Sequence, residues 1–296
     1  MDKYLIINAD DFGSFYGANM ATFDLLESGC ITSSTVMMPC MWSRHACKWA
    51  AEHPQYAIGV HLTTTAEWGA CKWGPVAASN TDSLRDEEGY MWHESDLFEE
   101  HADLEEARRE CLAQLDLAKK LGLDPSHWDN HMGSLYGIET GRVELLEMII
   151  DLSAEVGLPF RFPLAGIAGP EQASALDINV PRELIEMLFE NIQHYVKKKG
   201  VVCPDYLINH QYNDDNKKSY EAFREYMFEF VRQFPAGVSE TFIHPCIDTG
   251  EITAASGAGI HRIWEYKVYK DHRFQQHLAA LGIKKISYRD LAAMRA

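Results

Sequence analysis

The stretch Tyr4-Leu5-Ile6-Ile7-Asn8-Ala9-Asp10-Asp11-Phe12-Gly13 places two carboxylates side by side where an apolar run ends. The run predicts a buried strand, and Gly13 marks the turn that follows it. Neighbouring side chains on an extended segment point in opposite directions, but a chain that turns here can bring both aspartates to one cavity from different angles. We therefore expect one aspartate to hold a metal ion and the other to handle protons.

Two other interpretations of this aspartate pair compete with the first. Aspartate is common in turns and at helix starts, so Asp10 and Asp11 could simply begin the next element. The triplet Asp-Phe-Gly at 11–13 also occurs in protein kinases, where its aspartate binds magnesium. There it follows a Gly-rich loop, a strand lysine and a His-Arg-Asp loop, whereas here it opens the chain. We therefore reject the kinase interpretation.

The composition is typical of a soluble globular protein: 296 residues, 46% of them hydrophobic and 24% charged. A net charge of −17 would repel phosphate backbones and anionic membranes, so we expect neither nucleic acid nor membrane partners. The seven cysteines are scattered and form no Cys-x-x-Cys pair, which argues for reduced thiols rather than disulfides or a zinc knuckle. No signal-peptide pattern or membrane span is present, so we expect a cytoplasmic protein.

Apolar runs with strand character alternate with segments of helical period along the whole chain. The strand candidates are 4–8, 32–38, 56–63, 127–131, 159–163, 205–209 and 239–244, and the helix candidates are 16–28, 43–52, 97–121, 140–156, 181–199, 217–233 and 261–281. This alternation predicts a single α/β domain over 1–296 with parallel strands, either as an open doubly wound sheet or as a barrel. Seven or eight units favour the barrel. Nucleotide-binding glycine loops are absent, so a nucleotide cofactor is not expected.

Polar side chains lie at the carboxyl ends of nearly all the predicted strands. They are Asp10, Asp11, His61, His127, Asp129, His131, Arg161, Asn209, His210 and His244. The catalytic groups of parallel barrels gather at this face. Any one of these histidines taken alone would more often be structural. Together, a carboxylate from the first strand and imidazoles from the third and fourth form an Asp-His-His set that suits zinc, cobalt, manganese or magnesium.

The segment His127-Trp128-Asp129-Asn130-His131 places three polar side chains on one face of a strand. An extended segment cannot bring all three to one ion. We therefore assign His131 as the ligand, and we expect Asp129 and His127 to orient an imidazole or to contact substrate. A competing hypothesis makes His127 and Asp129 part of a two-His-one-carboxylate iron site, but such sites usually lie in antiparallel jelly-rolls.

Two stretches exceed ordinary loop length, 64–96 and 164–180, and loops this long are usually functional. The first carries aromatic residues that either stack on a sugar or bury a small core of the loop itself: Trp68, Trp73, Tyr90 and Trp92. Both alternatives stay open. The long loops and apolar helix faces also leave room for a homodimer.

In order along the chain, these motifs resemble the YdjC-like carbohydrate deacetylases, which include chitooligosaccharide deacetylase. The matching segments are Asn8–Gly13, Gly29–Thr35, Ile58–Thr63, His127–His131 and Glu240–Pro245. The resemblance implies a distorted seven-stranded (β/α) barrel and a divalent metal, Mg²⁺ or Zn²⁺ first and Co²⁺ or Mn²⁺ as alternatives. It implies Asp11, His61 and His131 as the metal ligands, and removal of an N-acetyl group from a small carbohydrate. Two features depart from the family pattern: Asn130 replaces the usual serine, and 205–216 lacks a Gly-aromatic-Gly pattern.

The mechanism expected from this resemblance gives the remaining residues their roles. Asp10, adjacent to the metal but not a ligand, would take a proton from water as the general base. His244 would protonate the leaving amine, unless it only orients a neighbour. Arg161 would either bind a substrate hydroxyl or phosphate or pair with Asp129. The competing functions are a glycosidase with paired carboxylates and a non-catalytic sugar-binding protein.

Overall fold

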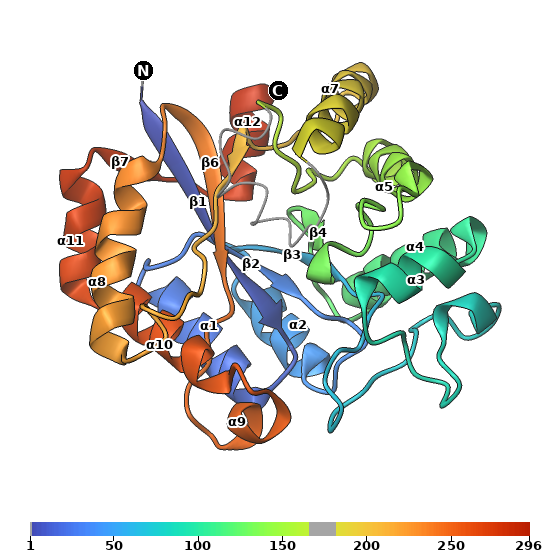
Figure 1. Cartoon of the computed structure of the whole chain (residues 1–296), viewed down its shortest axis with the longest axis horizontal. Coiled ribbons are helices and arrows are strands. Elements are labelled where there is room, and N and C mark those ends of the chain that lie inside the picture. Colours follow the sequence, from blue (N-terminus) through green and yellow to red (C-terminus); the bar gives the residue numbers. More distant parts are fainter. Residues whose placement is uncertain (1, 166–181) are drawn as a thin grey trace.

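Strands and helices alternate along the computed structural model, which describes residues 2–165 and 182–296 (Figure 1). The strands are β1 (Lys3–Phe12), β2 (Ser33–Val36), β3 (Ala57–Leu62), β4 (Trp128–Asn130), β5 (Tyr206–Leu207), β6 (Gly237–Ile243) and β7 (Ile283–Lys285). The helices are α1 (Tyr16–Glu27), α2 (Ser43–Glu52), α3 (Ser95–His101), α4 (Leu104–Lys120), α5 (Val143–Val156), α7 (Arg182–Lys199), α8 (Tyr220–Phe230), α9 (Glu251–Ala255), α10 (Gly259–Lys270), α11 (His272–Ala280) and α12 (Tyr288–Arg295). This order confirms the predicted α/β class.

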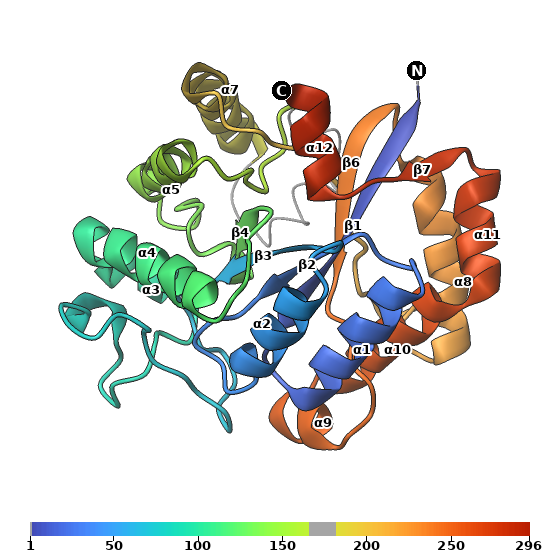
Figure 2. The same ribbon diagram turned by 180° about the vertical axis from the view of Figure 1, so that it is seen from behind.

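The strands form one parallel sheet that curls around a polar interior. Its order is β4-β3-β2-β1-β6-β5, and β7 pairs with the first residues of β1. β1 is therefore central, paired along most of its length with β6 and near its carboxyl end with β2. The helices lie outside the curl, with α8, α10 and α11 on the β6 side and α3, α4 and α5 on the β4 side (Figures 1 and 2).

Alternation along β1 separates the apolar packing from the polar interior. Leu5, Ile7 and Ala9 belong to the main hydrophobic cluster beneath the helices. Ile6 packs in a separate cluster with Val238, Tyr288 and Leu291. Asn8 and Asp10 follow Ile6 at spacings of two, so they share its face of the strand. The interior face of β1 therefore changes from apolar to acidic toward its carboxyl end.

The sheet is a curled half-barrel, and a closed seven-stranded barrel is not confirmed. The predicted strand 159–163 was wrong: Phe160 makes only an isolated bridge to Trp128, and its N–H donates to the carbonyl of Val202 at 2.9 Å. Pro159 and Pro163 lack an N–H group, so this segment cannot form a continuous ladder. The seventh strand is instead β7, which the sequence analysis did not identify.

Two predicted helices are each interrupted by a capping aspartate. The candidate 97–121 is divided into α3 and α4 because the side chain of Asp103 accepts hydrogen bonds from the first N–H groups of α4. The candidate 261–281 is divided into α10 and α11 because Asp271 caps α11 in the same way.

The loop at 64–96 buries two of its four aromatic rings. Trp68 and Trp73 lie in a second hydrophobic cluster, and the indole N–H of Trp73 donates to the carbonyl of Thr65 at 2.9 Å. Trp92 is half-buried, whereas Tyr90 is 41% exposed. The loop-core interpretation therefore holds for Trp68 and Trp73. Most of the other long loop, 164–180, lies outside the described residues.

All seven cysteines are free thiols, as predicted, and six of them are buried. Within residues 2–165 and 182–296, no helix is both long enough and apolar enough to cross a bilayer.

A substitution at Gly59 tests how closely β3 packs against the chain at His127, directly before β4. A Cβ atom at this position would lie 2.4 Å from the carbonyl oxygen of His127 and 2.8 Å from its Nδ1. We expect Gly59→Ala to lower the free energy of unfolding by about 1–3 kcal/mol, because the strands would have to separate. Gly69→Ala is the control, because a Cβ there meets nothing within 4 Å. Denaturant unfolding measures both variants, and equal stabilities would contradict this account.

Candidate active site

A cavity of about 210 Å³ opens at the carboxyl ends of the strands. Its walls contain six of the ten polar residues that the sequence analysis selected, Asp10, Asp11, His61, His131, Arg161 and His244, together with Asn130, which it noted as a departure from the family pattern. They also contain residues that it did not select: Glu67, Met132, Gly133, Tyr136, Leu207, Phe242 and Arg262. The cavity therefore joins β1, β3, β4, β5 and β6 to the long loop at 64–96 and to α10.

A local irregularity lets both aspartates reach this cavity. The register between β1 and β2 shifts between Ala9 and Phe12, and Asp11 adopts a left-handed conformation with φ 57°. Gly13 follows with φ 91°, and a Cβ there would lie 3.0 Å from the Cα of Ser43. In a regular strand Asp10 and Asp11 would face opposite sides, so the left-handed residue brings the second carboxylate back to the interior.

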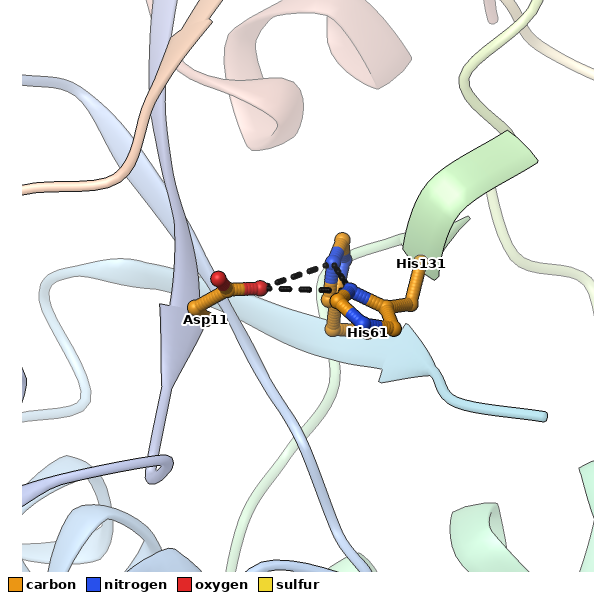
Figure 3. Close-up of side chains that lie close together, drawn as sticks. All are labelled: Asp11, His61 and His131. Atoms are coloured by element: carbon orange, nitrogen blue, oxygen red, sulfur yellow. Dashed lines mark hydrogen bonds and ion pairs between the residues drawn. The ribbon is translucent and has the colours of Figure 1, made fainter. Parts of the chain in front are cut away.

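Asp11, His61 and His131 converge from three separate elements, as expected. Figure 3 shows the three side chains pointing toward one another from β1, from β3 and from the turn after β4. Asp11 Oδ1 lies 3.4 Å from His61 Nε2 and 3.3 Å from His131 Nδ1. The two imidazole nitrogens are 3.3 Å apart. All three residues are buried.

This triangle of donor atoms fits a divalent cation. Three ligands placed tetrahedrally around zinc at about 2.0–2.1 Å would lie about 3.3–3.4 Å from one another, which matches the observed spacings. Among the described residues, none makes a well-directed hydrogen bond to Asp11 Oδ1, although this oxygen is fully buried. A buried carboxylate oxygen facing two imidazole nitrogens has the character of a metal ligand.

Two outer carboxylates hold the imidazoles in the orientation that metal binding requires. Asp129 Oδ1 accepts from His61 Nδ1 at 2.6 Å, and Glu67 Oε2 accepts from His131 Nε2 at 2.9 Å. Because a carboxylate can only accept, the outer nitrogen of each ring carries the hydrogen. In the neutral rings, His61 Nε2 and His131 Nδ1 then present lone pairs to the centre of the triangle.

The same carboxylates change the basicity of both rings. Burial alone would lower the pKa of each histidine, but Asp129 and Asp10 raise the pKa of His61 to about 10. Glu67 and Asp11 raise the pKa of His131 to about 9. A cation in the triangle would replace the additional protons on these rings, so its binding would be coupled to proton release.

Arg262 holds the other oxygen of Asp11, and the sequence analysis did not identify this arginine. Its Nη1 lies 2.5 Å from Asp11 Oδ2, and its guanidinium stacks over the ring of Trp68 at 5.3 Å. Burial alone would raise the pKa of Asp11, but Arg262 and the neighbouring histidines lower it well below its usual range. The carboxylate is therefore ionised, with Oδ1 left for the triangle.

Asp10 belongs to a separate network. Its two oxygens accept from Arg161 Nη1 and Nη2, both at 2.7 Å, and Oδ1 also accepts from Asn8 at 2.8 Å. Burial alone would raise the pKa of Asp10, but Arg161 lowers it to about 2. Arg161 also contacts Asp129 and Glu240, each at 2.8 Å. Of the two expectations for Arg161, the structure therefore shows the pairing with Asp129, together with two further carboxylates.

A second group of potential metal ligands is already paired with the charged side chain of Arg161. Asp10, His61 and Asp129 also have donor atoms within 4.8 Å of one another. The Arg161 guanidinium bridges two of them, because Nη2 lies within 2.8 Å of both carboxylates. A side-chain cation therefore takes the place that a second metal ion would need.

The other three candidate histidines lie in different places, and His210, whose Nε2 is 3.0 Å from Glu265 Oε1, does not line the cavity. His127 is fully buried and does not line the cavity; its ring stacks on Tyr288, and its Nε2 lies 3.3 Å from Asn8 Oδ1. It is therefore linked to Asp10 through Asn8, which donates to Asp10 Oδ1. His244 lines the cavity, and its backbone N–H donates to Glu265 at 2.5 Å. Burial and Arg262 lower the pKa of His244.

Comparison with known proteins places this architecture in a family. The family described as YdjC-like protein matches residues 4–280. The chain belongs to the YdjC-like family. This confirms the resemblance inferred from the motifs.

Individual relatives of this YdjC-like protein support the same relationship. A carbohydrate deacetylase of Clostridium beijerinckii is 24% identical over 287 residues, which cover 97% of this chain and 99% of the relative. One of Enterococcus faecalis is 31% identical over 192 residues, covering 64% and 70%. A chitooligosaccharide deacetylase of Yersinia enterocolitica is 32% identical over 136 residues, covering 44% and 50%. A crystal structure from Enterococcus faecalis V583, described as a putative cellobiose-phosphate cleavage protein, matches with TM-score 0.73 at 26% identity and covers 98% of this chain and 99% of its own.

Glu67 provides a test of the outer carboxylates. We expect Glu67→Ala to weaken Zn²⁺ binding about 10- to 100-fold, because His131 loses the partner that orients its ring. Glu67→Gln keeps an oxygen acceptor and should lose less. The control is Glu88→Ala, which removes an exposed carboxylate from the same loop. Competition with a chromophoric chelator measures the affinities, and a Glu67→Ala protein that binds like the control would contradict the assignment.

Proposed function

We propose that this protein is a metal-dependent deacetylase that hydrolyses the N-acetyl group of an acetylated mono- or oligosaccharide. The observation that carries the proposal is the buried triangle of Asp11, His61 and His131 with a separate, ionised carboxylate, Asp10, in the same cavity. The relatives called carbohydrate deacetylase and chitooligosaccharide deacetylase support the substrate class.

Asp11, His61 and His131 would hold the cation. A bound divalent cation polarises an amide carbonyl and lowers the pKa of a water molecule. Two imidazoles and one carboxylate suit Zn²⁺, Co²⁺ or Mn²⁺, whereas Mg²⁺ prefers oxygen ligands. We therefore favour Zn²⁺ over Mg²⁺ for this site.

Asp10 would act as the general base. With a pKa near 2 it is ionised at neutral pH, so it can accept a proton from water. The paired guanidinium of Arg161 makes the neutral form of Asp10 unfavourable, so the proton is passed on rather than retained. The bidentate pair also fixes the direction in which the carboxylate faces the cavity.

His244 would act as the general acid toward the leaving amine. It lines the same cavity as Asp10, and its ring packs edge-on against Phe242 at 5.7 Å. Burial and Arg262 lower the pKa of His244, so the ring would take up only transiently the proton that Asp10 releases and would give it to the amine. The hydrogen bond from the backbone N–H of His244 to Glu265 holds this residue in place directly after β6.

The glycosidase alternative fits the cavity less well. A glycosidase needs one carboxyl group with a raised pKa as its acid. The pKa values of Asp10 and Asp11 are both lowered, so neither would be that acid, and another carboxyl group would have to supply it. The non-catalytic alternative would be supported by a missing ligand, whereas all three ligands of the triangle are present.

Two aspartate variants separate the metal from the proton transfer. We expect Asp11→Asn to lose both bound metal and acetate release. We expect Asp10→Asn to keep the metal but to lower turnover about 10²- to 10⁴-fold, because the base is removed while the ligands remain. Asp116→Asn, at an exposed position on α4, is the control. Metal content and released acetate are measured on the same samples; full turnover by Asp10→Asn would make the base assignment wrong.

Metal removal distinguishes deacetylation from glycoside cleavage. We expect chelation followed by dialysis to abolish acetate release from N-acetylglucosamine oligomers, and added Zn²⁺ to restore it. Chromatography of the sugars detects any shortening of the chain. Chain shortening that persists in chelator would instead support the glycosidase.

A further inference from the structure

Tyr288 lies at the opposite end of the sheet interior from the cavity. It is the first residue of α12, is fully buried, and packs with Ile6 and Val238. Ile6 occupies the same face of β1 as Asp10, four residues earlier. Tyr288 therefore packs against the interior face of β1 four residues before Asp10, and it does not itself line the cavity.

One chain of contacts runs from the Tyr288 hydroxyl to the proposed base. The hydroxyl donates to Glu240 Oε2. Glu240 Oε1 accepts from Arg161 Nε at 2.8 Å, and the opposite edge of the same guanidinium holds both oxygens of Asp10. Glu240 and Arg161 are at most 3% exposed, so water does not substitute for these bonds.

A second chain of contacts begins at the Tyr288 ring. This ring stacks on His127 with centroids 3.7 Å apart and planes 9° from parallel. His127 Nε2 lies 3.3 Å from Asn8 Oδ1, and Asn8 Nδ2 donates to Asp10 Oδ1 at 2.8 Å. Both chains of contacts therefore start at Tyr288 and end at the carboxylate of Asp10.

We propose that Tyr288 is a positioning residue that fixes the orientation of Asp10 through Glu240 and Arg161. The inference rests on the proposed function, in which Asp10 is the base. Arg161 lies among three carboxylates and could divide its hydrogen bonds among them in several ways. The Tyr288 hydroxyl satisfies one oxygen of Glu240, which leaves the other for Arg161 Nε alone. Without the hydroxyl, the second oxygen of Glu240 would also accept a hydrogen bond from Arg161. The guanidinium would then move away from Asp10.

Tyr288→Phe tests this proposal because it removes the hydroxyl and keeps the stacked ring. We expect kcat for acetate release to fall about 10- to 100-fold, with KM and metal content unchanged, because only the direction of the base changes. Tyr266→Phe is the matched control: it also removes a hydroxyl bonded to a carboxylate, Asp24, at 2.8 Å. Glu240→Gln should lower kcat similarly, and the double variant should lose no more than the stronger single variant.

A second measurement does not depend on activity. In protein labelled with ¹⁵N-arginine, the Nε–H signal of Arg161 is assigned by its absence in Arg161→Lys, and its hydrogen exchange is followed by NMR. We expect exchange at least about tenfold faster in Tyr288→Phe than in Tyr266→Phe, because the Glu240 partner is no longer held.

The outcomes separate this inference from the proposed function. Equal Arg161 exchange in the two phenylalanine variants overturns the inference, even if kcat falls. A kcat of Tyr288→Phe equal to that of Tyr266→Phe also overturns it. If the natural protein releases no acetate from any substrate, the proposed function fails, and Arg161 exchange alone then decides whether Tyr288 holds the network.

Discussion

The left-handed backbone at Asp11 is the constraint on which the site depends. On a regular strand Asp10 and Asp11 would lie on opposite faces, with one carboxylate beneath the helices, where an unpaired charge is unfavourable. A non-glycine residue in this conformation costs about 1–3 kcal/mol, so the surrounding contacts must hold it there. The ion pair between Asp11 and Arg262 and the turn at Gly13 provide such contacts. One strand end can then supply two carboxylates with different functions.

Charge pairing explains how so many acidic groups share one small interior. Arg161 balances Asp10 and Asp129, Arg262 balances Asp11, and each imidazole of the triangle has its own outer carboxylate. Buried carboxylates without such partners would become protonated. The guanidinium of Arg161 also bridges the two carboxylates of the second group of ligands, which shares His61 with the triangle. The arrangement therefore favours one cation and one free base over a pair of cations.

Local patterns in the sequence were sufficient to predict which polar residues lie at the ends of strands. They did not predict contacts between residues that are far apart in the chain. Asp11 and His61 follow apolar runs, and His131 ends the polar segment 127–131, so their position at strand ends made all three candidates. The choice of Asp11 rather than Asp10 as the ligand came from the resemblance to the family. Arg262 lies 251 residues from Asp11, and Tyr288 lies 48 residues from Glu240, so no local period relates them. The segment 159–163 was apolar enough to predict a strand, but its prolines prevent a ladder. β7 was missed because it has three residues, two of them exposed lysines.

Asp129 connects the triangle that contains Asp11 to the Arg161 network that contains Asp10. Its Oδ1 accepts from His61 Nδ1, and its Oδ2 accepts from Thr35 at 2.9 Å and pairs with Arg161. The first contact orients a ligand of the triangle, and the last shares the guanidinium that holds Asp10. With both oxygens occupied, the carboxylate cannot rotate toward one partner without releasing the other. The direction of the ligand ring and the direction of the base are therefore set together by a single buried side chain of β4.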